Sequence, residues 1–168
     1  MHRRILLLSG LCLAVSQASA ADAPFAVGGV MLLQPQRGIE PRVQSVEALA
    51  AYIQRIGGAA QVFFKNHPIG AKAAGYLVIA VKPAQDSNVW IDFSPKIPAP
   101  MAEELTGQLR KVPALQVSEG PIVFALQVGL NGAAPPNGQS PMPEEWAAEL
   151  RNAGRPVEAG ELALRVWR

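Results

Sequence analysis

The spacing of apolar residues changes several times between Ser45 and Leu130, and the order of these changes strongly constrains the fold. Apolar residues first recur with the helical spacing i, i+3, i+4, i+7. They are Val46, Leu49, Ala50, Ile53 and Ile56. Ser45 is a favourable N-cap, and the same stripe continues past Gly57-Gly58 to Phe64. We therefore expect a helix that reaches Lys65.

The period then shortens to two. Residues 76–82 are apolar and rich in β-branched side chains, and a turn follows at residues 83–87. After the turn, Val89, Ile91 and Phe93 alternate with Trp90 and Asp92. This pattern predicts a β-hairpin. A second helical pattern covers residues 101–112, and a second regular alternation covers residues 121–130. The order helix, strand, strand, helix, strand predicts an α+β fold with a small antiparallel sheet and helices packed on it.

Both ends add further elements. Residues 25–33 are apolar and compatible with a strand, with Gly28-Gly29 as its weak point. We expect a final helix that begins near Pro143 and has Trp146 on its buried side. Residues 161–167 suggest a short closing strand. The second face of the sheet also carries apolar residues, so we expect the terminal additions to cover part of it. These residues are Val78, Ala80, Val123 and Ala125.

Residues 1–20 have the three parts of a cleavable secretory signal. A basic start leads into an apolar core at residues 5–15, and the segment ends in Ala18-Ser19-Ala20. The apolar core is too short for a membrane-spanning helix, which needs about 20 residues. We expect cleavage after Ala20, a location in the periplasm or outside the cell, and no stable membrane anchor. Residues 21–168 are expected to form a single domain.

Cleavage would change the chemistry available to the chain. It removes Cys12, the only cysteine, and leaves His67 as the only histidine. Thiol nucleophiles, disulfides and cysteine zinc sites are thereby excluded. Arg3 and Arg4 also leave, so 13 basic residues face 13 acidic ones, which argues against a nucleic-acid partner. We expect His67 to cap a helix end, and we predict no catalytic, metal-binding or cofactor-binding residue and no enzymatic activity.

The elements from about residue 45 to residue 130 resemble the C-terminal domain of the TonB/TolA class of periplasmic proteins. The likeness rests on the leading helix, the Asn66-His67-Pro68 ending, the hairpin, the second helix running into Val112-Pro113-Ala114, and the strand at residues 120–130. The resemblance implies a protein-binding module. Proteins of that class carry a membrane anchor and a long spacer, whereas this chain shows a cleavable signal and a C-terminal extension at residues 131–168.

The leading functional hypothesis is a soluble periplasmic interaction module, such as an accessory or assembly factor of an envelope complex, with a protein partner and no cofactor. A small-ligand-binding protein is the first alternative, and a hydrolase that uses carboxylates is the second. A partner strand is expected to pair beside residues 121–130, taken as an edge strand without internal proline or charge. The alternative is that this strand lies in the middle of the sheet, where its apolar residues build the core. The candidate partner-binding residues are Trp90, Val123, Ala125 and Gln127. For Trp90 and Trp167, core and interface roles are both open.

Overall fold

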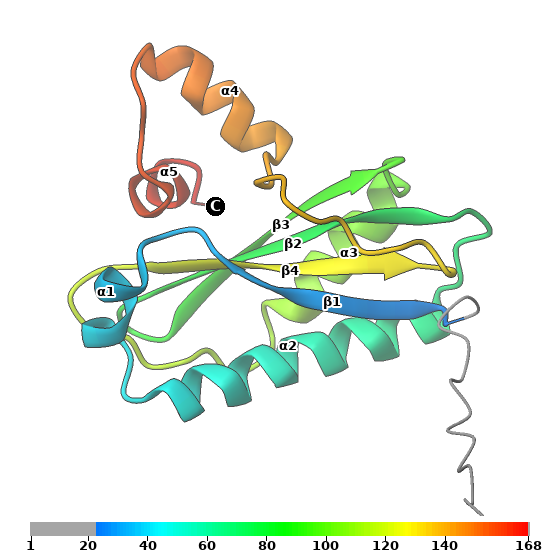
Figure 1. Cartoon of the computed structure of the whole chain (residues 1–168), viewed down its shortest axis with the longest axis horizontal. Helices are drawn as coiled ribbons and strands as arrows, with labels where there is room; N and C mark the ends of the chain where they lie inside the picture. The colour runs from blue at the N-terminus through cyan, green and yellow to red at the C-terminus, as the bar shows by residue number, and fades with distance from the viewer. Residues whose placement is uncertain (1–22, 168) are drawn as a thin grey trace, which may run out of the picture.

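The computed structural model describes residues 23–167 (Figure 1). The predicted signal at residues 1–20 lies outside the described residues. The elements follow in the order β1 (Phe25–Leu32), α1 (Gln36–Ile39), the 3-10 helix η2 (Glu40–Arg42), α2 (Val46–Asn66), β2 (Ala73–Lys82), β3 (Asp86–Ser94), α3 (Ala99–Leu109), β4 (Ile122–Leu130), α4 (Glu144–Ala153) and α5 (Ala159–Arg165).

The strands form one antiparallel sheet in the order β1-β4-β2-β3. The predicted α+β class with an antiparallel sheet is confirmed, and so is the β2–β3 hairpin. β1 is the fourth strand, and its register against β4 shifts between Val27 and Gly29. The irregularity therefore lies at the predicted weak point of this strand.

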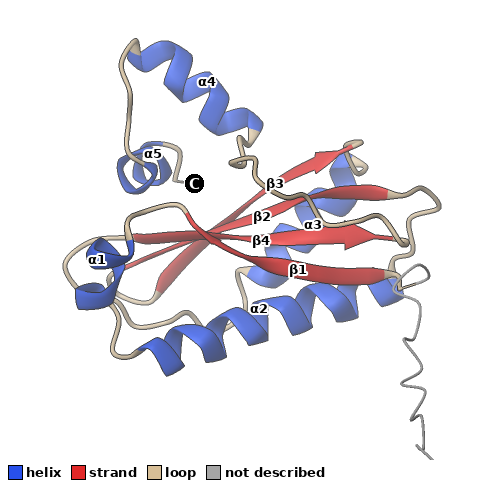
Figure 2. Cartoon of the chain, viewed as in Figure 1, coloured by secondary structure: helices blue, strands red, loops and turns tan. Residues whose placement is uncertain are grey.

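Helices α2 and α3 cover the first face of the sheet (Figure 2). α2 begins where the Ser45 hydroxyl accepts a hydrogen bond from the Ala48 N–H at 3.1 Å, and it continues through Gly57-Gly58 to Asn66. The expected long helix is confirmed, because the buried stripe of Tyr52, Ile56, Ala60, Phe63 and Phe64 outweighs the low helix propensity of two glycines.

Helices α4 and α5 cover part of the second face, as expected from its apolar residues. Trp146 of α4 is 3% exposed, which confirms its predicted core position, and Leu162 of α5 is buried beside it. Residues 131–143 run across the same face from β4 towards β3 (Figure 1). Along this path the Tyr76 hydroxyl on β2 donates to the Gln139 carbonyl, and the Met142 N–H donates to Asp92 on β3 at 2.7 Å.

The predicted closing strand is wrong, because residues 159–165 form α5. Leu162, Leu164 and Val166 alternate as a strand would, but Leu162 and Val166 are also four residues apart, a spacing that places them on one face of a helix. In the structure Arg165 contacts Glu161 at 2.7 Å, one helical turn earlier, while Leu162 and Ala163 pack towards the sheet. The packing of Leu162 and Ala163 against the sheet and the contact between Arg165 and Glu161 therefore favour the helix.

Gly129 of β4 allows the crossing segment to approach the sheet. A Cβ atom at this position would lie 1.9 Å from the Ala133 carbonyl oxygen. Only glycine leaves room for so close a contact between two backbones. Within residues 23–167, no helix is long and apolar enough to cross a membrane.

Candidate functional site

β3 lies at one edge of the sheet, beyond β2. It pairs with β2 along its whole length, from Asp86 opposite Lys82 to Ser94 opposite Ala74. Within residues 23–167, no other segment forms a backbone hydrogen bond with β3. Its outer side therefore offers backbone N–H and C=O groups that a further strand can use, apart from the Val89 N–H, which the Asn88 side chain already binds.

A hollow of about 730 Å³ follows this edge, and we call it the β3 groove. Residues 88–93 of β3 form its floor, and α3 forms one wall with Ala102, Thr106 and Gly107 among its lining residues. The opposite wall consists of Met142, Glu144, Glu145 and Val166. The groove therefore combines a free strand edge with two walls on opposite faces of the sheet.

Trp90 lies in the floor of the β3 groove and is 5% exposed. Its ring meets Trp146 edge to face, with ring centroids 5.5 Å apart, and meets Trp167 in the same manner at 6.2 Å. Trp90 and Trp167 thus belong to the second-face cluster, while Trp90 also lines the groove. A core role and a lining role coexist for Trp90.

Asn88 is the one buried polar residue among the described residues. Its side-chain oxygen accepts a hydrogen bond from the Val89 N–H at 2.9 Å, and its amide nitrogen has no partner among the described atoms. An unpaired buried donor costs about 1–3 kcal/mol, so a ligand carbonyl that reached it would gain a favourable bond. Asn88 lines the same groove.

Two polar contacts place the start of α4 over β3. Lys96, which follows β3, contacts Glu144 at 2.8 Å, and Asp92 accepts the Met142 N–H. The hydrogen bond from Lys96 lowers the pKa of Glu144 and raises the pKa of Lys96 itself. Both side chains are exposed, so this contact orients the wall more than it stabilises the fold.

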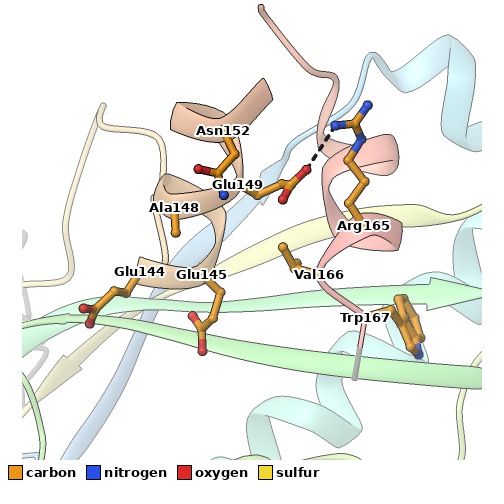
Figure 3. Close-up of a pocket in the computed structure, with 8 residues that line it drawn as sticks. All are labelled: Glu144, Glu145, Ala148, Glu149, Asn152, Arg165, Val166 and Trp167. Carbon is orange, nitrogen blue, oxygen red and sulfur yellow. Dashed lines mark hydrogen bonds and ion pairs between the residues drawn. The ribbon is translucent and has the colours of Figure 1, made fainter. Parts of the chain in front are cut away.

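A second hollow of about 510 Å³ lies between α4 and the C-terminal residues (Figure 3). It shares Glu144, Glu145 and Val166 with the β3 groove. Glu144 and Glu145 reach from α4 towards the sheet, and Glu149 pairs with Arg165 at 3.0 Å. Three carboxylates and one guanidinium therefore line this hollow.

The prediction that a partner pairs beside residues 121–130 is wrong. β4 lies between β1 and β2 and is paired on both sides. Val123 and Ala125 are fully buried in the second-face cluster, and Gln127 is half-buried with its side-chain oxygen close to Gly29. The structure does not bring these three residues to an open edge. The regular alternation that suggested an edge belongs to a strand buried on both faces.

His67 lies at the C-cap of α2, as expected. Its ring stacks on Phe63 with centroids 4.3 Å apart, Nδ1 lies 3.0 Å from the Phe63 carbonyl oxygen, and Nε2 lies 3.4 Å from Glu104. These contacts tie the end of α2 to α3. Within the described part of the chain, no three side chains of the histidine, cysteine, aspartate and glutamate types gather as a metal site would require.

Sequence reasoning missed the walls of the β3 groove. Gly107 has no side chain, so the sequence gives no sign that this position lines a groove. Residues 95–143 separate β3 from α4, so no local pattern indicates that the two elements meet. One signal was present: Asn88 lies two residues before Trp90 on the same face of β3, and its partner in β2 is the apolar Ala80. A polar side chain opposite a buried apolar residue needs a hydrogen-bond partner, and it marks this stretch of β3 as unusual.

In comparisons with known proteins, no family model, no curated protein and no solved structure matches this chain. The resemblance of residues 45–130 to the TonB/TolA class stays a prediction that these comparisons do not test.

Proposed function

We propose that this chain is a protein-interaction module that receives an extended segment of a partner protein beside β3. The observation that carries the proposal is the coincidence of a free strand edge with the β3 groove. Strand addition supplies affinity through backbone hydrogen bonds, and the walls supply selectivity for side chains.

The opposite edge of the sheet supports this choice by contrast. β1 also lacks an outer partner strand among residues 23–167, but its register is interrupted next to Gly28. Val27, Val30 and Leu32 are exposed there, at 46%, 42% and 39%, so apolar surface is present at this edge and the choice rests on the regularity of pairing. A bulge weakens pairing at an edge, whereas β3 pairs with β2 without a register shift. β3 is therefore the better template for an added strand.

The proposed setting is the periplasm or the exterior of the cell, reached by cleavage after Ala20. Its support is the signal pattern of residues 1–20. Export would fit an accessory or assembly factor of an envelope complex. N-terminal sequencing of the protein recovered from the envelope fraction is expected to return Ala21, or Asp22 if cleavage follows Ala21. A sequence that begins at Met1 would contradict this setting.

The interaction is tested with a displayed library of random peptides and two glycine variants. Gly107 lines the groove, and a Cβ added there meets nothing within 4 Å, so a side chain can begin at this position, and Gly107→Leu would add volume to the groove. Gly58 is also helical, also has open space and lies on α2. We expect selected peptides to lose binding to Gly107→Leu and to keep binding to Gly58→Leu.

The binding mode is tested by amide hydrogen exchange. An added strand is expected to slow exchange at alternate amides of residues 86–94, because those N–H groups would gain partners. Selected peptides that bind both leucine variants equally, or leave exchange along β3 unchanged, would contradict the proposal.

A small-ligand-binding role is the second candidate. The volume of the groove falls in the range of about 300–1,000 Å³ common for ligand sites, and its lining combines apolar side chains with a few polar ones. This role predicts that a screen of small molecules raises the melting temperature while exchange at the amides along β3 stays unchanged. The exchange experiment therefore separates the two functions.

A further inference from the structure

The two walls of the β3 groove differ in chemistry, and this difference indicates what kind of segment would fit. The inference rests on the proposed function. Residues of an added strand alternate between the two faces of a sheet. One set of side chains would therefore face α3, and the other set would face α4.

The α4 side is acidic. Asp92 of β3 lies on this face, opposite Tyr76 in the register, and Glu144 and Glu145 reach towards the sheet from α4 (Figure 3). Lys96 offsets Glu144 at 2.8 Å. Glu145 forms no ion pair within residues 23–167. The acidic surface continues into the second hollow, which shares Glu144 and Glu145 with the groove.

The α3 side is largely apolar and has room. Val89 and Phe93 of β3 belong to the first-face core, and Ala102 lines the wall above them. Gly107 leaves open space where a side chain would stand. Glu103 and Arg110 also line this wall, and their opposite charges give it no net sign.

Asn88 is a second polar feature of the groove, independent of the acidic wall. Its side chain is 1% exposed, lines the groove and retains a donor without a partner. Its oxygen already binds the Val89 N–H, as an incoming carbonyl would. The amide nitrogen is itself buried, so an added strand reaches it only if the Asn88 side chain turns away from the Val89 N–H and exposes both groups to the partner.

We infer that the partner segment is an extended peptide in which basic residues alternate with apolar ones. Its lysine or arginine side chains face Asp92, Glu144 and Glu145, and its apolar side chains face α3. Opposite charges across an interface raise the rate of association and suppress wrong partners. Apolar side chains that enter the space beside Gly107 add buried area.

Three synthetic peptides test this inference by fluorescence anisotropy on residues 21–168. One alternates lysine with valine, one threonine with valine, and one glutamate with valine. We expect the lysine peptide to bind most tightly and the glutamate peptide most weakly. Added salt should reduce the preference, because these carboxylates are exposed to solvent.

A charge-reversal pair sharpens the test. Glu145→Lys is expected to weaken the lysine peptide by about two- to fivefold at low salt and to strengthen the glutamate peptide, as for an exposed ion pair. Glu40→Lys on η2 changes the net charge equally but lies outside the lining of both hollows. It should leave the order and the affinities unchanged.

The outcomes separate this inference from the function on which it rests. If the glutamate or threonine peptide binds as tightly as the lysine peptide, and Gly107→Leu abolishes that binding, the charge inference is wrong and the interaction module stands. If Glu40→Lys shifts the affinities as much as Glu145→Lys, the preference reflects net charge and the inference is again wrong. If none of the three peptides binds while library-selected peptides still bind beside β3, the charge inference is wrong and the interaction module stands. If all bind Gly107→Leu unchanged, the proposed function is contradicted as well.

Discussion

The indole of Trp90 on β3 meets the indole of Trp146 on α4 edge to face, with ring centroids 5.5 Å apart and planes at 69°. This contact joins the edge strand to the C-terminal helices. Trp90 also lines the β3 groove, so the same residue that holds α4 contributes to the proposed binding surface. The C-terminal extension therefore forms one wall of the groove.

Truncation of Trp146 is expected to destabilise the fold strongly. Trp146 is 3% exposed, and Trp146→Ala should lose about 3–5 kcal/mol of unfolding free energy, as for other buried aromatic residues. Trp146→Phe should lose much less. It keeps an aromatic ring against Trp90, and it removes an indole N–H that has no partner among the described atoms. Urea denaturation measures both, and equal losses for the two variants would contradict this account.

Two helical glycines are expected to be sites of stabilisation. An added Cβ meets nothing within 4 Å at Gly58 of α2 or at Gly107 of α3. Gly58→Ala and Gly107→Ala should each raise the unfolding free energy by about 0.5–1 kcal/mol, because alanine is the better helix former. Chemical denaturation checks the gain. A loss of stability at either position would show that its surroundings are more crowded than the structure indicates.

Gly129→Ala is expected to have the opposite effect. The new Cβ, built with ideal geometry, would lie 1.9 Å from the Ala133 carbonyl oxygen, and the two atoms would overlap. We expect a loss of about 1–3 kcal/mol or more, together with displacement of the segment that crosses the sheet. Gly70→Ala is the matched control, because it lies in a loop with open space around it. Thermal unfolding of the two variants should differ clearly, and similar melting temperatures would contradict the close approach.

His67→Ala should leave peptide binding intact, because His67 lies outside the lining of the β3 groove. The variant loses the stacking on Phe63 and the contact with Glu104, so we expect a loss of about 0.5–1 kcal/mol, at or a little above the usual range for surface positions. Anisotropy and urea denaturation check both statements. A loss of binding by a folded variant would give His67 a functional role.

Glu161 is expected to contribute to stability in a pH-dependent manner. Hydrogen bonds from Arg155 and Arg165 lower the pKa of Glu161 below its usual value of 4.5. A carboxyl whose pKa is lower in the folded state stabilises the fold above the unfolded pKa and loses this effect as the pH falls through the folded pKa. Glu161→Gln should therefore be less stable than the natural sequence near neutral pH, and the difference should shrink below about pH 4. Denaturation across this range measures it, and a constant difference would contradict the mechanism.

Local sequence patterns determined most of the elements. Helix α2 was predictable because Ser45 caps it and one apolar stripe runs its length, and α4 because Pro143 precedes it and Trp146 faces inwards. The β2–β3 hairpin was predictable because its strands are neighbours in the chain and the turn between them is short. In each case the interactions that define the element join residues close in sequence, so a short window of the chain contains the information.

The order of the strands and the site were decided by the tertiary structure alone. β4 pairs with β1, and about 90 residues of chain separate the two strands. No local sequence pattern indicates a pairing over such a distance, so an interior strand was mistaken for an edge strand. α5 was mistaken for a strand because Leu162 and Leu164 alternate, whereas in the helix Leu162 is buried and Leu164 is exposed. The β3 groove depends on β3, α3 and α4 meeting in space. Each wall is an ordinary helix surface by itself, and only the packing of both helices around one free strand edge gives these surfaces a common function.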